Sequence, residues 1–310
     1  MKTVLILLST YNGEKYLREQ LNSLYAQEGV EMKIVVRDDG SKDSTITILD
    51  EYKLKYGRMD IIKGNNIGVG PSFLELIKIA VQDYLAFDYY AFCDQDDVWF
   101  AHKLESGVRA LDKSDKSLKM YCSGFVNTDA ELSAINHSHF CLVNSFGANL
   151  VANHIIGCSM MFNKALLDEI NKINIRPFII NNGVIPIHDA WAAMVAYCLD
   201  ADVIQSHASM MYYRQHGNNT IGAKHGFLSI QWNRITRYLK TATHVKANKC
   251  IIALQVLNGI PEKNKQLLEL VADYRTNYWK KIQLMTNRKI YEYGIFDNIG
   301  TFLTLLFNKF

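Results

Sequence analysis

The sequence lacks three patterns that would each assign it to a common class of protein. None of its six cysteines forms a CxxC pair, so we expect buried free thiols in a reducing compartment. No run of about 18 or more apolar residues occurs, which argues against a helix that spans a membrane. No G-x-G-x-x-G motif follows the first apolar run, which counts against a nicotinamide or flavin Rossmann enzyme.

A strong charge of either sign is also absent. The formal net charge is +3, which is too low to indicate a nucleic-acid partner, and we expect none. The chain does have a hydrophobic content of 49% and a charged content of 21% over 310 residues, which fit a folded enzyme. That length allows one large domain, or one domain with an extension.

Strand and helix patterns alternate through the first third of the chain. The continuous apolar run at residues 3–8 predicts a parallel strand buried on both faces. Further strands are predicted at residues 32–36, 60–62 and 89–93, and helices at residues 14–27, 42–56 and 71–85. This order predicts an α/β fold with a Rossmann-like, mostly parallel sheet flanked by helices.

The pattern is less regular after residue 119. Strands are predicted at residues 120–126, 157–162 and 209–214, and helices at residues 165–170 and 189–199. After about residue 225 the segments are mostly helical in pattern. The loop at residues 217–222 is the predicted domain boundary.

Three polar clusters follow predicted strands: STYN at residues 9–12, DDGS at residues 38–41 and DQDD at residues 94–97. Ligands of an open parallel sheet bind at the carboxyl ends of its strands. We therefore expect the three clusters to share one rim. A single acidic loop is typical of an ordinary turn, whereas three clusters on one rim indicate a ligand site.

These clusters, extended to VLILLSTYNG (4–13), VVRDDGSKD (35–43) and DQDDVW (94–99), resemble family 2 glycosyltransferases. The likeness continues through HDAW (188–191) and YRQHGNN (213–219), and it is greatest to the rhamnosyltransferase branch that builds bacterial surface polysaccharides. It implies an inverting nucleotide-sugar enzyme with a GT-A catalytic domain at residues 1–222. The nucleotide-sugar half would span about 1–100 and the acceptor half about 101–222, with a helical C-terminal extension at 223–310.

The resemblance implies a divalent metal, Mn²⁺ or Mg²⁺, at the acidic cluster. A hard cation there can bridge the two phosphates of the donor and stabilise the leaving diphosphate. The likeness places the metal at Asp96 and a ribose or sugar contact at Asp94. His216, which follows a predicted strand, would approach the metal or the diphosphate. Asp97 has an alternative role as a cap of the helix expected near Ala101.

A second set of residues would bind the rest of the nucleotide sugar. The resemblance implies that Asp39 accepts a hydrogen bond from the imide N–H of a uracil or thymine ring, and that Thr10, Tyr11 and Glu14 line the base pocket. The alternative for the DDGS cluster is a strand-to-helix turn with helix caps. Arg214 is a candidate partner for phosphate charge.

An inverting transfer needs a general base for the acceptor hydroxyl, and Asp189 in HDAW is the candidate. A helix N-terminus keeps such an aspartate charged but makes it a weaker base; its alternative role is a plain helix cap. The remaining candidates would shape the acceptor and sugar cleft, and among them His188 departs from the acidic residue that many relatives carry. These cleft residues are Trp99, Gly157, Cys158, His188 and Trp191.

The motif type points to dTDP-L-rhamnose as donor and to a saccharide acceptor linked to polyprenyl diphosphate. A UDP-hexose donor stays open, as does a non-catalytic carbohydrate-binding scaffold on the same fold. A sugar-1-phosphate nucleotidyltransferase is disfavoured because STYNG is not the Gly-rich, basic loop that those enzymes carry after the first strand.

The C-terminal extension interleaves Lys and Arg with Trp232, Tyr238, Tyr278 and Trp279, and it ends in an apolar segment at residues 295–307. Such a segment can lie in a bilayer interface. The alternative is helices packed on the catalytic domain or on a second subunit of a homo-oligomer. We expect a cytoplasmic protein that contacts the inner face of the cell membrane peripherally.

Overall fold

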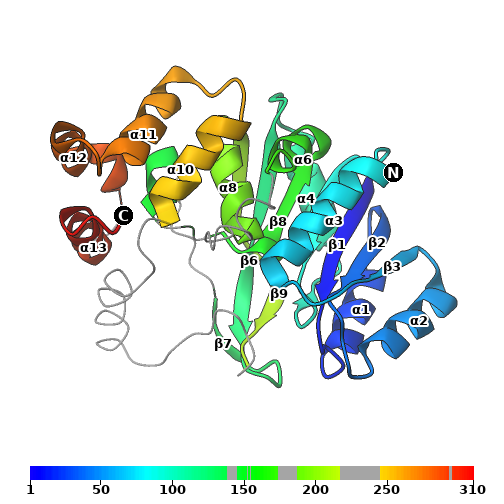
Figure 1. Ribbon diagram of the computed structural model, residues 1–310. Coiled ribbons are helices and arrows are strands. Elements are labelled where there is room, and N and C mark those ends of the chain that lie inside the picture. Colours follow the sequence, from blue (N-terminus) through cyan, green and yellow to red (C-terminus); the bar gives the residue numbers. More distant parts are fainter. Residues whose placement is uncertain (138–144, 152, 154, 174–186, 217–244, 293–294) are drawn as a thin grey trace. The chain divides into compact units, whose positions relative to one another are not determined.

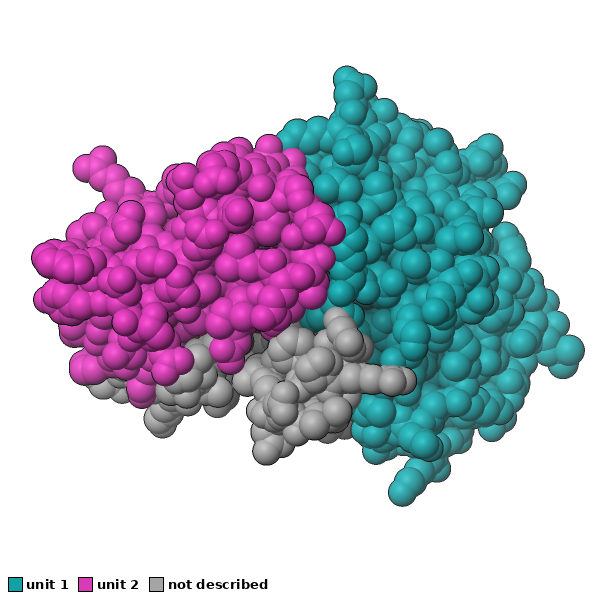
Figure 2. Space-filling model, turned by 45° about the horizontal axis from the view of Figure 1, so that its top comes forward, with its two compact units in different colours: residues 1–140, 155–192, 201–220 teal, residues 141–154, 193–200, 221–310 magenta. Residues whose placement is uncertain are grey.

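The computed structural model describes residues 1–137, 145–151, 153, 155–173, 187–216, 245–292 and 295–310. The chain divides into two compact units (Figure 2). Unit 1 comprises Met1–Phe140, Ile155–Ala192 and Ala201–Thr220, and unit 2 comprises Cys141–His154, Ala193–Asp200 and Ile221–Phe310. The last segment of unit 2 begins at Ile221, and unit 2 also includes two short earlier segments. Residues 217–219 of the last motif, Trp232 and Tyr238 lie outside the described residues.

A sheet forms the centre of unit 1 (Figure 1). Its first half is parallel and runs in the order β3-β2-β1-β4. These strands are β1 (Thr3–Thr10), β2 (Glu31–Asp38), β3 (Met59–Lys63) and β4 (Tyr89–Cys93). The second half continues in the order β8-β6-β9-β5, where β8 is antiparallel to β4 and β6, and β9 is parallel to β6.

The second-half strands are β5 (Val98–Trp99), β6 (Lys119–Thr128), β8 (Met160–Asn163) and β9 (Asp202–Arg214), and β7 (Ala134–His137) pairs with β6. The expectation of a mostly parallel sheet flanked by helices is confirmed. The short strands β5 and β7 have no counterpart in the sequence analysis, because two to four residues carry no readable period.

Both faces of the parallel strands are buried, which explains the unbroken apolar run in β1. Val4, Ile6 and Leu8 face a core shared with three helices, while Leu5 and Leu7 point to the opposite face. The three helices of the first core are α1 (Leu17–Tyr25), α2 (Thr45–Tyr56) and α4 (Lys103–Leu111). The other helices of unit 1 include α3 (Val69–Asp83), which packs on β1 and β2, and α6 (Lys164–Ile170), which packs on α3. Helix α8 (His188–Cys198) begins in unit 1.

Helices α1 and α2 begin three residues later than the sequence predicts. Residues before Leu17 and Thr45 are non-helical because their backbone N–H groups bond to side chains of a neighbouring loop instead. The predicted strand at 157–162 begins with a 3₁₀ turn at Gly157–Ser159. The predicted strand at 209–214 is longer and starts at Asp202.

Unit 2 is helical, as predicted for the C-terminal part. It contains α5 (Phe146–Val151), α10 (Val245–Val256), α11 (Glu262–Asp273), α12 (Tyr278–Met285), a 3₁₀ turn at Arg288–Ile290 and α13 (Ile295–Leu306). Helix α11 buries Leu267, Leu268 and Val271. Across the ranges that the structure describes, every helix is too short or too polar to cross a membrane.

The cysteines follow the expected pattern in the described ranges. Cys93, Cys122, Cys158, Cys198 and Cys250 are all buried and form no disulfide there. The sixth, Cys141, lies outside the described residues.

Candidate functional site

The parallel register brings the three polar clusters to one edge of the sheet, as expected. Thr10 at the end of β1 is paired with Asp38 at the end of β2, and Leu8 is paired with Cys93 at the end of β4. The chain leaves the sheet just beyond these pairs in each strand. The three loops that follow, at residues 11–16, 39–44 and 94–97, form the rim of the candidate site.

The first two rim loops are joined by reciprocal hydrogen bonds between side chains and backbone. The backbone N–H of Asn12 donates to Ser41 Oγ at 2.9 Å, and the Asn12 side-chain oxygen accepts from the Lys42 N–H at 2.9 Å. The Gly13 N–H donates to Thr45 Oγ1 at 2.8 Å. Asn12 has a positive φ of 47°, a conformation that asparagine tolerates better than most residues. STYN and DDGS therefore form a single rigid platform.

Glu14 belongs to this platform through two bonds. Its backbone N–H donates to Asp43 at 3.0 Å, and its carboxylate accepts from the Ser44 N–H at 2.9 Å. Thr10 is 1% exposed, and its hydroxyl donates to Asp38 at 3.0 Å. Tyr11 is different because its side chain is 43% exposed. Of the residues predicted to line a base pocket, Tyr11 is the one with an exposed ring.

The DQDD loop is fixed to this platform by Gln95, which the sequence analysis did not select. Its side-chain oxygen accepts from the Tyr11 N–H at 2.9 Å, and its amide donates to the Tyr11 carbonyl at 3.1 Å. A Cβ on Gly13 would lie 2.3 Å from the Gln95 oxygen, so glycine leaves room for this contact. The position of Gln95 between Asp94 and Asp96 of the acidic motif is a sequence feature that could have identified it.

Asp39 lies beneath the rim and anchors the loop before α3. Its carboxylate pairs with Arg37 and accepts hydrogen bonds from the backbone N–H groups of Ile67 and Gly68. The side chain is buried, with 2% of the residue exposed. Both carboxylate oxygens are bonded, so this arrangement gives no support to the predicted contact of Asp39 with a pyrimidine base.

The two residues predicted to hold the metal lie together. His216 Nε2 is 2.8 Å from Asp96 Oδ2, and both side chains are partly exposed. The His216 ring also packs against Tyr16, with ring centroids 4.8 Å apart. An imidazole and a carboxylate side by side are suitable ligands for Mn²⁺.

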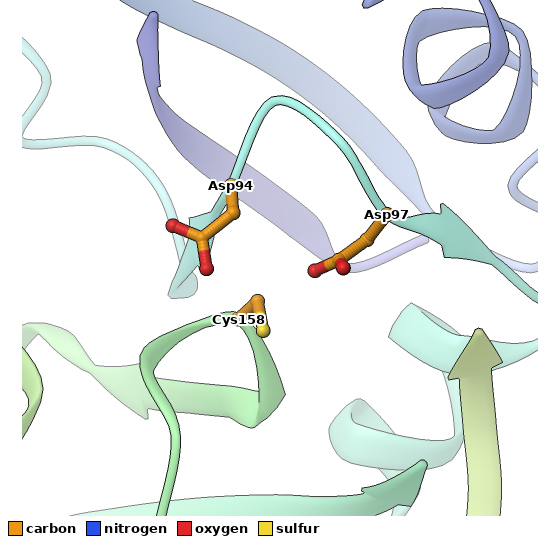
Figure 3. Close-up of side chains that lie close together, drawn as sticks. All are labelled: Asp94, Asp97 and Cys158. Carbon is orange, nitrogen blue, oxygen red and sulfur yellow. The ribbon is translucent and has the colours of Figure 1, made fainter. Parts of the chain in front are cut away.

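A second ligand group combines two aspartates of the same loop with Cys158 of the 3₁₀ turn at Gly157–Ser159 (Figure 3). One carboxylate oxygen each of Asp94 and Asp97 and the Cys158 sulfur all lie within 4.8 Å of one another. Asp97 is 0% exposed, and its Oδ2 has no hydrogen-bond partner within the described part of the chain. The alternative role of Asp97 as a helix cap is wrong, because α4 begins at Lys103 after His102.

Burial sets the electrostatics of this cluster. It raises the pKa of Asp94 to about 7, with the nearby Asp96 charge as a second cause, and it raises the pKa of Asp97 well above its ordinary value. The pKa of the Cys158 thiol is also raised well above its usual range by burial. Burial lowers the pKa of Lys103, which approaches the cluster from α4, to about 8.

The residues present fit a hard divalent cation. Carboxylates are the preferred ligands of Mg²⁺ and Mn²⁺, and Asp97 Oδ2, which has no hydrogen-bond partner among the described residues, is an acceptor available at the cluster. A cation would also offset the negative charge that raises the carboxyl pKa values. Asp94, Asp96, Asp97 and His216 are therefore the residues that could hold it.

Arg214 supports the acidic loop from below. Its Nε donates to the Asp96 carbonyl at 2.9 Å, its guanidinium bonds to the Ala130 carbonyl and pairs with Glu19, and it lies 4.4 Å from the Tyr16 ring. The residue is 2% exposed. These contacts occupy the guanidinium, so the structure gives the predicted role in phosphate binding no support and indicates a positioning role instead.

The start of α8 brings Asp189 and His188 to the site. Asp189 is half-buried in the first turn, its charge raises the pKa of Asp94, and its carboxylate accepts from the Ala190 N–H at 2.5 Å. His188 is 5% exposed and stacks on Phe73, with ring centroids 3.8 Å apart. Burial lowers the pKa of His188 to about 3, so its ring is neutral.

Gly157 makes the close packing at His188 possible. A Cβ at this position would lie 2.5 Å from His188 Nε2 and 3.4 Å from the Asp189 Cβ. Any other residue would therefore displace the α8 start. Gly157 lies beside Asp189, the predicted general base, and Cys158 lies beside Asp94 and Asp97 of the acidic loop.

The two tryptophans predicted to line the cleft are core residues in the structure. Trp191 is 0% exposed, and its indole N–H donates to the Ile170 carbonyl at 3.0 Å. Trp99 is 3% exposed, and the Lys103 ammonium lies 4.6 Å from its ring. Neither ring has a face exposed to a sugar, so their assignment to the sugar cleft has no support. His188, buried against Phe73, has no exposed surface to offer a sugar either.

The fold is of the GT-A-like class. Two solved structures match almost the whole chain: S. aureus TarS 1-349 in complex with UDP-GlcNAc (TM-score 0.55, 19% identity, 98% of this chain and 90% of that chain) and the mannosyltransferase PcManGT from Pyrobaculum calidifontis in complex with GDP-Man and Mn²⁺ (TM-score 0.53, 14% identity, 99% and 85%). At these identities the likeness shows the fold alone.

The family model described as glycosyl transferase family 2 matches residues 5–171. The chain is also 32% identical over 234 residues to the dTDP-rhamnosyl transferase RfbG of Shigella flexneri, which covers 71% of this chain and 75% of that protein. The chain belongs to glycosyltransferase family 2, and its activity is of the glycosyltransferase class, EC 2.4. The resemblance seen in the motifs is confirmed.

Proposed function

We propose that this glycosyltransferase transfers L-rhamnose, with inversion, from dTDP-L-rhamnose to a hydroxyl of a growing surface polysaccharide linked to polyprenyl diphosphate. The observation that carries the donor assignment is the 32% identity to RfbG, a dTDP-rhamnosyl transferase, over most of both chains. The DQDDVW, HDAW and YRQHGNN motifs favour the same branch of the family. Neither observation identifies the acceptor, which is inferred from the branch alone.

In the proposed mechanism Asp189 accepts the proton of the acceptor hydroxyl as that hydroxyl attacks the anomeric carbon. Its place in the first turn of α8 keeps the carboxylate charged, so proton transfer occurs late in the attack. Gly157 and the neutral His188 ring position Asp189 from behind. The exposed ring of Tyr11 offers a face on which the pyrimidine base of the donor can stack.

Asp96 and His216, with Asp94 or Asp97, would hold a divalent cation next to the diphosphate. The bound cation would offset the charge that develops on the leaving dTDP. Gln95 and Arg214 hold the loop that presents these ligands.

A nucleotide-release assay tests the proposal. The protein is incubated with dTDP-rhamnose, UDP-GlcNAc, UDP-glucose or GDP-mannose, with Mn²⁺ or with EDTA, and release of the nucleoside diphosphate is followed. We expect slow dTDP release from dTDP-rhamnose that requires the metal. Faster release of UDP from a UDP-hexose would overturn the rhamnose assignment and leave the family chemistry intact.

The UDP-hexose alternative has one observation in its favour: the matching TarS structure holds UDP-GlcNAc. A non-catalytic scaffold on this fold is the third candidate. Calorimetric binding of a nucleotide sugar without release of nucleotide, in the presence of metal and of saccharide acceptors, would favour the scaffold.

A further inference from the structure

Helix α13 of unit 2 (Figure 1) buries two threonines together with Leu305 and exposes three other apolar side chains. Thr301 and Thr304 are 0% and 3% exposed, whereas Ile299, Phe302 and Leu306 are 44%, 43% and 44% exposed. The three exposed residues are spaced i, i+3 and i+7, so they share one face of the helix. A helix that packs only within its own unit is expected to bury these apolar side chains and to expose the threonines. Within the described residues, this face of α13 is therefore not covered by apolar side chains.

Helix α12 presents a similar exposed group. Tyr278 and Trp279 are 71% and 76% exposed, the largest exposures of any aromatic residue in the described ranges. The two helices pack together in unit 2, and Lys281 of α12 donates to the Leu306 carbonyl at the end of α13, at 2.8 Å. The α12–α13 surface consists of Tyr278, Trp279, Ile299, Phe302, Leu306 and Phe307.

The segment of the chain that carries this surface has a net positive charge. Between Asp273 and the last residue, Phe310, the sequence has six Lys or Arg residues and three Asp or Glu residues. The resulting charge of +3 equals the net charge of the whole chain, so the other residues balance to zero. Arg288 and Lys289 are exposed in the turn after α12, while Lys280 pairs with Asp273 at 2.6 Å.

We propose that the α12–α13 surface docks on an anionic lipid bilayer. Tryptophan and tyrosine favour the interface between headgroups and acyl chains, where exposed aliphatic side chains can be buried and Lys and Arg can bind anionic headgroups. A second copy of this chain is a poorer occupant, because pairing the surface with itself would bring the same positive charges together. The inference concerns unit 2 and does not depend on the donor sugar.

Vesicle flotation with the full chain tests this docking. Vesicles of phosphatidylcholine with a minor part of phosphatidylglycerol are compared with pure phosphatidylcholine, at low and at high salt. We expect flotation with the anionic vesicles that weakens as salt rises. Trp279→Ser with Phe302→Ser should lower the apparent affinity at least about tenfold, because two anchors leave the interface.

Two further double variants separate the contributions. Arg288→Gln with Lys289→Gln should weaken binding to anionic vesicles by roughly 10-fold or more and leave pure phosphatidylcholine binding unchanged. Leu54→Ser with Leu85→Ser is the matched control, since these residues are 90% and 61% exposed but lie in unit 1. All the altered side chains of this control and of the two test variants are exposed, so the fold should be kept, which circular dichroism checks.

Two outcomes would overturn the proposal. One is equal recovery of the wild-type chain in the soluble fraction with and without anionic vesicles. The other is a dimer in light scattering that becomes a monomer in Trp279→Ser with Phe302→Ser, which would assign the surface to a second copy. Nucleotide release without acceptor is measured in parallel, so a failure of docking is distinguishable from a failure of the proposed sugar transfer.

Discussion

The first two residues of α8 place the neutral imidazole ring of His188 next to the carboxylate of Asp189. His188 is buried against Phe73 and Phe92 and cannot carry charge at neutral pH, whereas the next residue, Asp189, reaches the acidic rim. The imidazole therefore serves as a rigid, uncharged support for the start of the helix. Gly157 is the residue that allows the contact, because no side chain fits between its backbone and the ring.

The neutral state of His188 predicts a loss of stability in acid. Its pKa in the folded protein is lowered to about 3 by burial, so the unfolded chain binds a proton below about pH 6.5 and the folded chain does not. The contribution is complete above the unfolded pKa and is lost as pH falls toward 3. Between about pH 6.5 and 5 this amounts to about 2 kcal/mol. In urea unfolding at several pH values, the free energy of unfolding of His188→Phe should fall by about 2 kcal/mol less than that of the wild-type chain over this pH range. Parallel curves of unfolding free energy against pH for the two proteins would contradict the prediction.

Replacement of the proposed base tests the chemistry at the same helix start. Asp189→Asn removes the proton acceptor while it keeps size and hydrogen bonding, so donor binding by calorimetry should stay within about twofold. Turnover should fall by roughly 10²–10⁴, the range typical of a lost general base. Asp168→Asn, an exposed change on α6, is the control and should keep wild-type turnover. Wild-type turnover in Asp189→Asn would remove this residue from the mechanism.

At the scale of elements, the rim works because three loops are bonded into one platform. The N–H groups of residues 12–14 bond to side chains of the second loop, and the Gln95 amide bonds both backbone groups of Tyr11. Arg214 at the end of β9 holds the same DQDD loop from a strand far away in sequence. Loop positions that would be mobile alone are in this way fixed for ligand binding.

Gln95→Ala tests whether this platform supports donor binding. The change deletes two hydrogen bonds to Tyr11, each worth about 1 kcal/mol, so the donor Kd should rise by roughly 10-fold or more. The melting temperature should fall only slightly, since the loop is at the surface. Gln266→Ala on α11, which removes one exposed side-chain bond, is the matched control. An unchanged Kd in Gln95→Ala would show that the platform does not depend on this bridge.

For the whole molecule, the proposed metal site would link stability to metal binding through Asp94. Its raised pKa, about 7, means that the folded, metal-free chain keeps a proton that the unfolded chain loses at lower pH. This contribution is complete below the unfolded pKa and is lost as pH rises through about 7. A bound cation requires the ionised carboxylate of Asp94, so the stabilisation by the cation should increase as pH rises.

Thermal unfolding with MnCl₂ or EDTA measures this linkage. We expect Mn²⁺ to raise the melting temperature more at about pH 8 than at about pH 6, because Asp94 is then ionised. In Asp94→Asn the metal-free protein should lose less stability between these pH values, and the pH dependence of the Mn²⁺ effect should become smaller, although Asp97 still has a raised pKa. Equal Mn²⁺ shifts at both pH values in the wild-type chain would contradict the assignment.

The sequence by itself determined the family, the alternation of strands and helices in the first half and the loops that form the rim. Those features depend on local information: unbroken apolar runs, helical spacing, and motifs such as DQDDVW, which keep their meaning without knowledge of distant contacts. The mostly parallel sheet then brings STYN, DDGS and DQDD together by geometry alone.

Only the tertiary structure decided the tasks of individual side chains. Trp99 and Trp191 are buried, Asp97 faces Cys158 instead of capping a helix, and Arg214 bonds to partners more than 80 residues away. The burial of Thr301 and Thr304 and the exposure of Phe302 likewise do not follow from the apolar composition of α13. These outcomes depend on which distant atoms fill the space around each side chain, and that information is not contained in any local pattern.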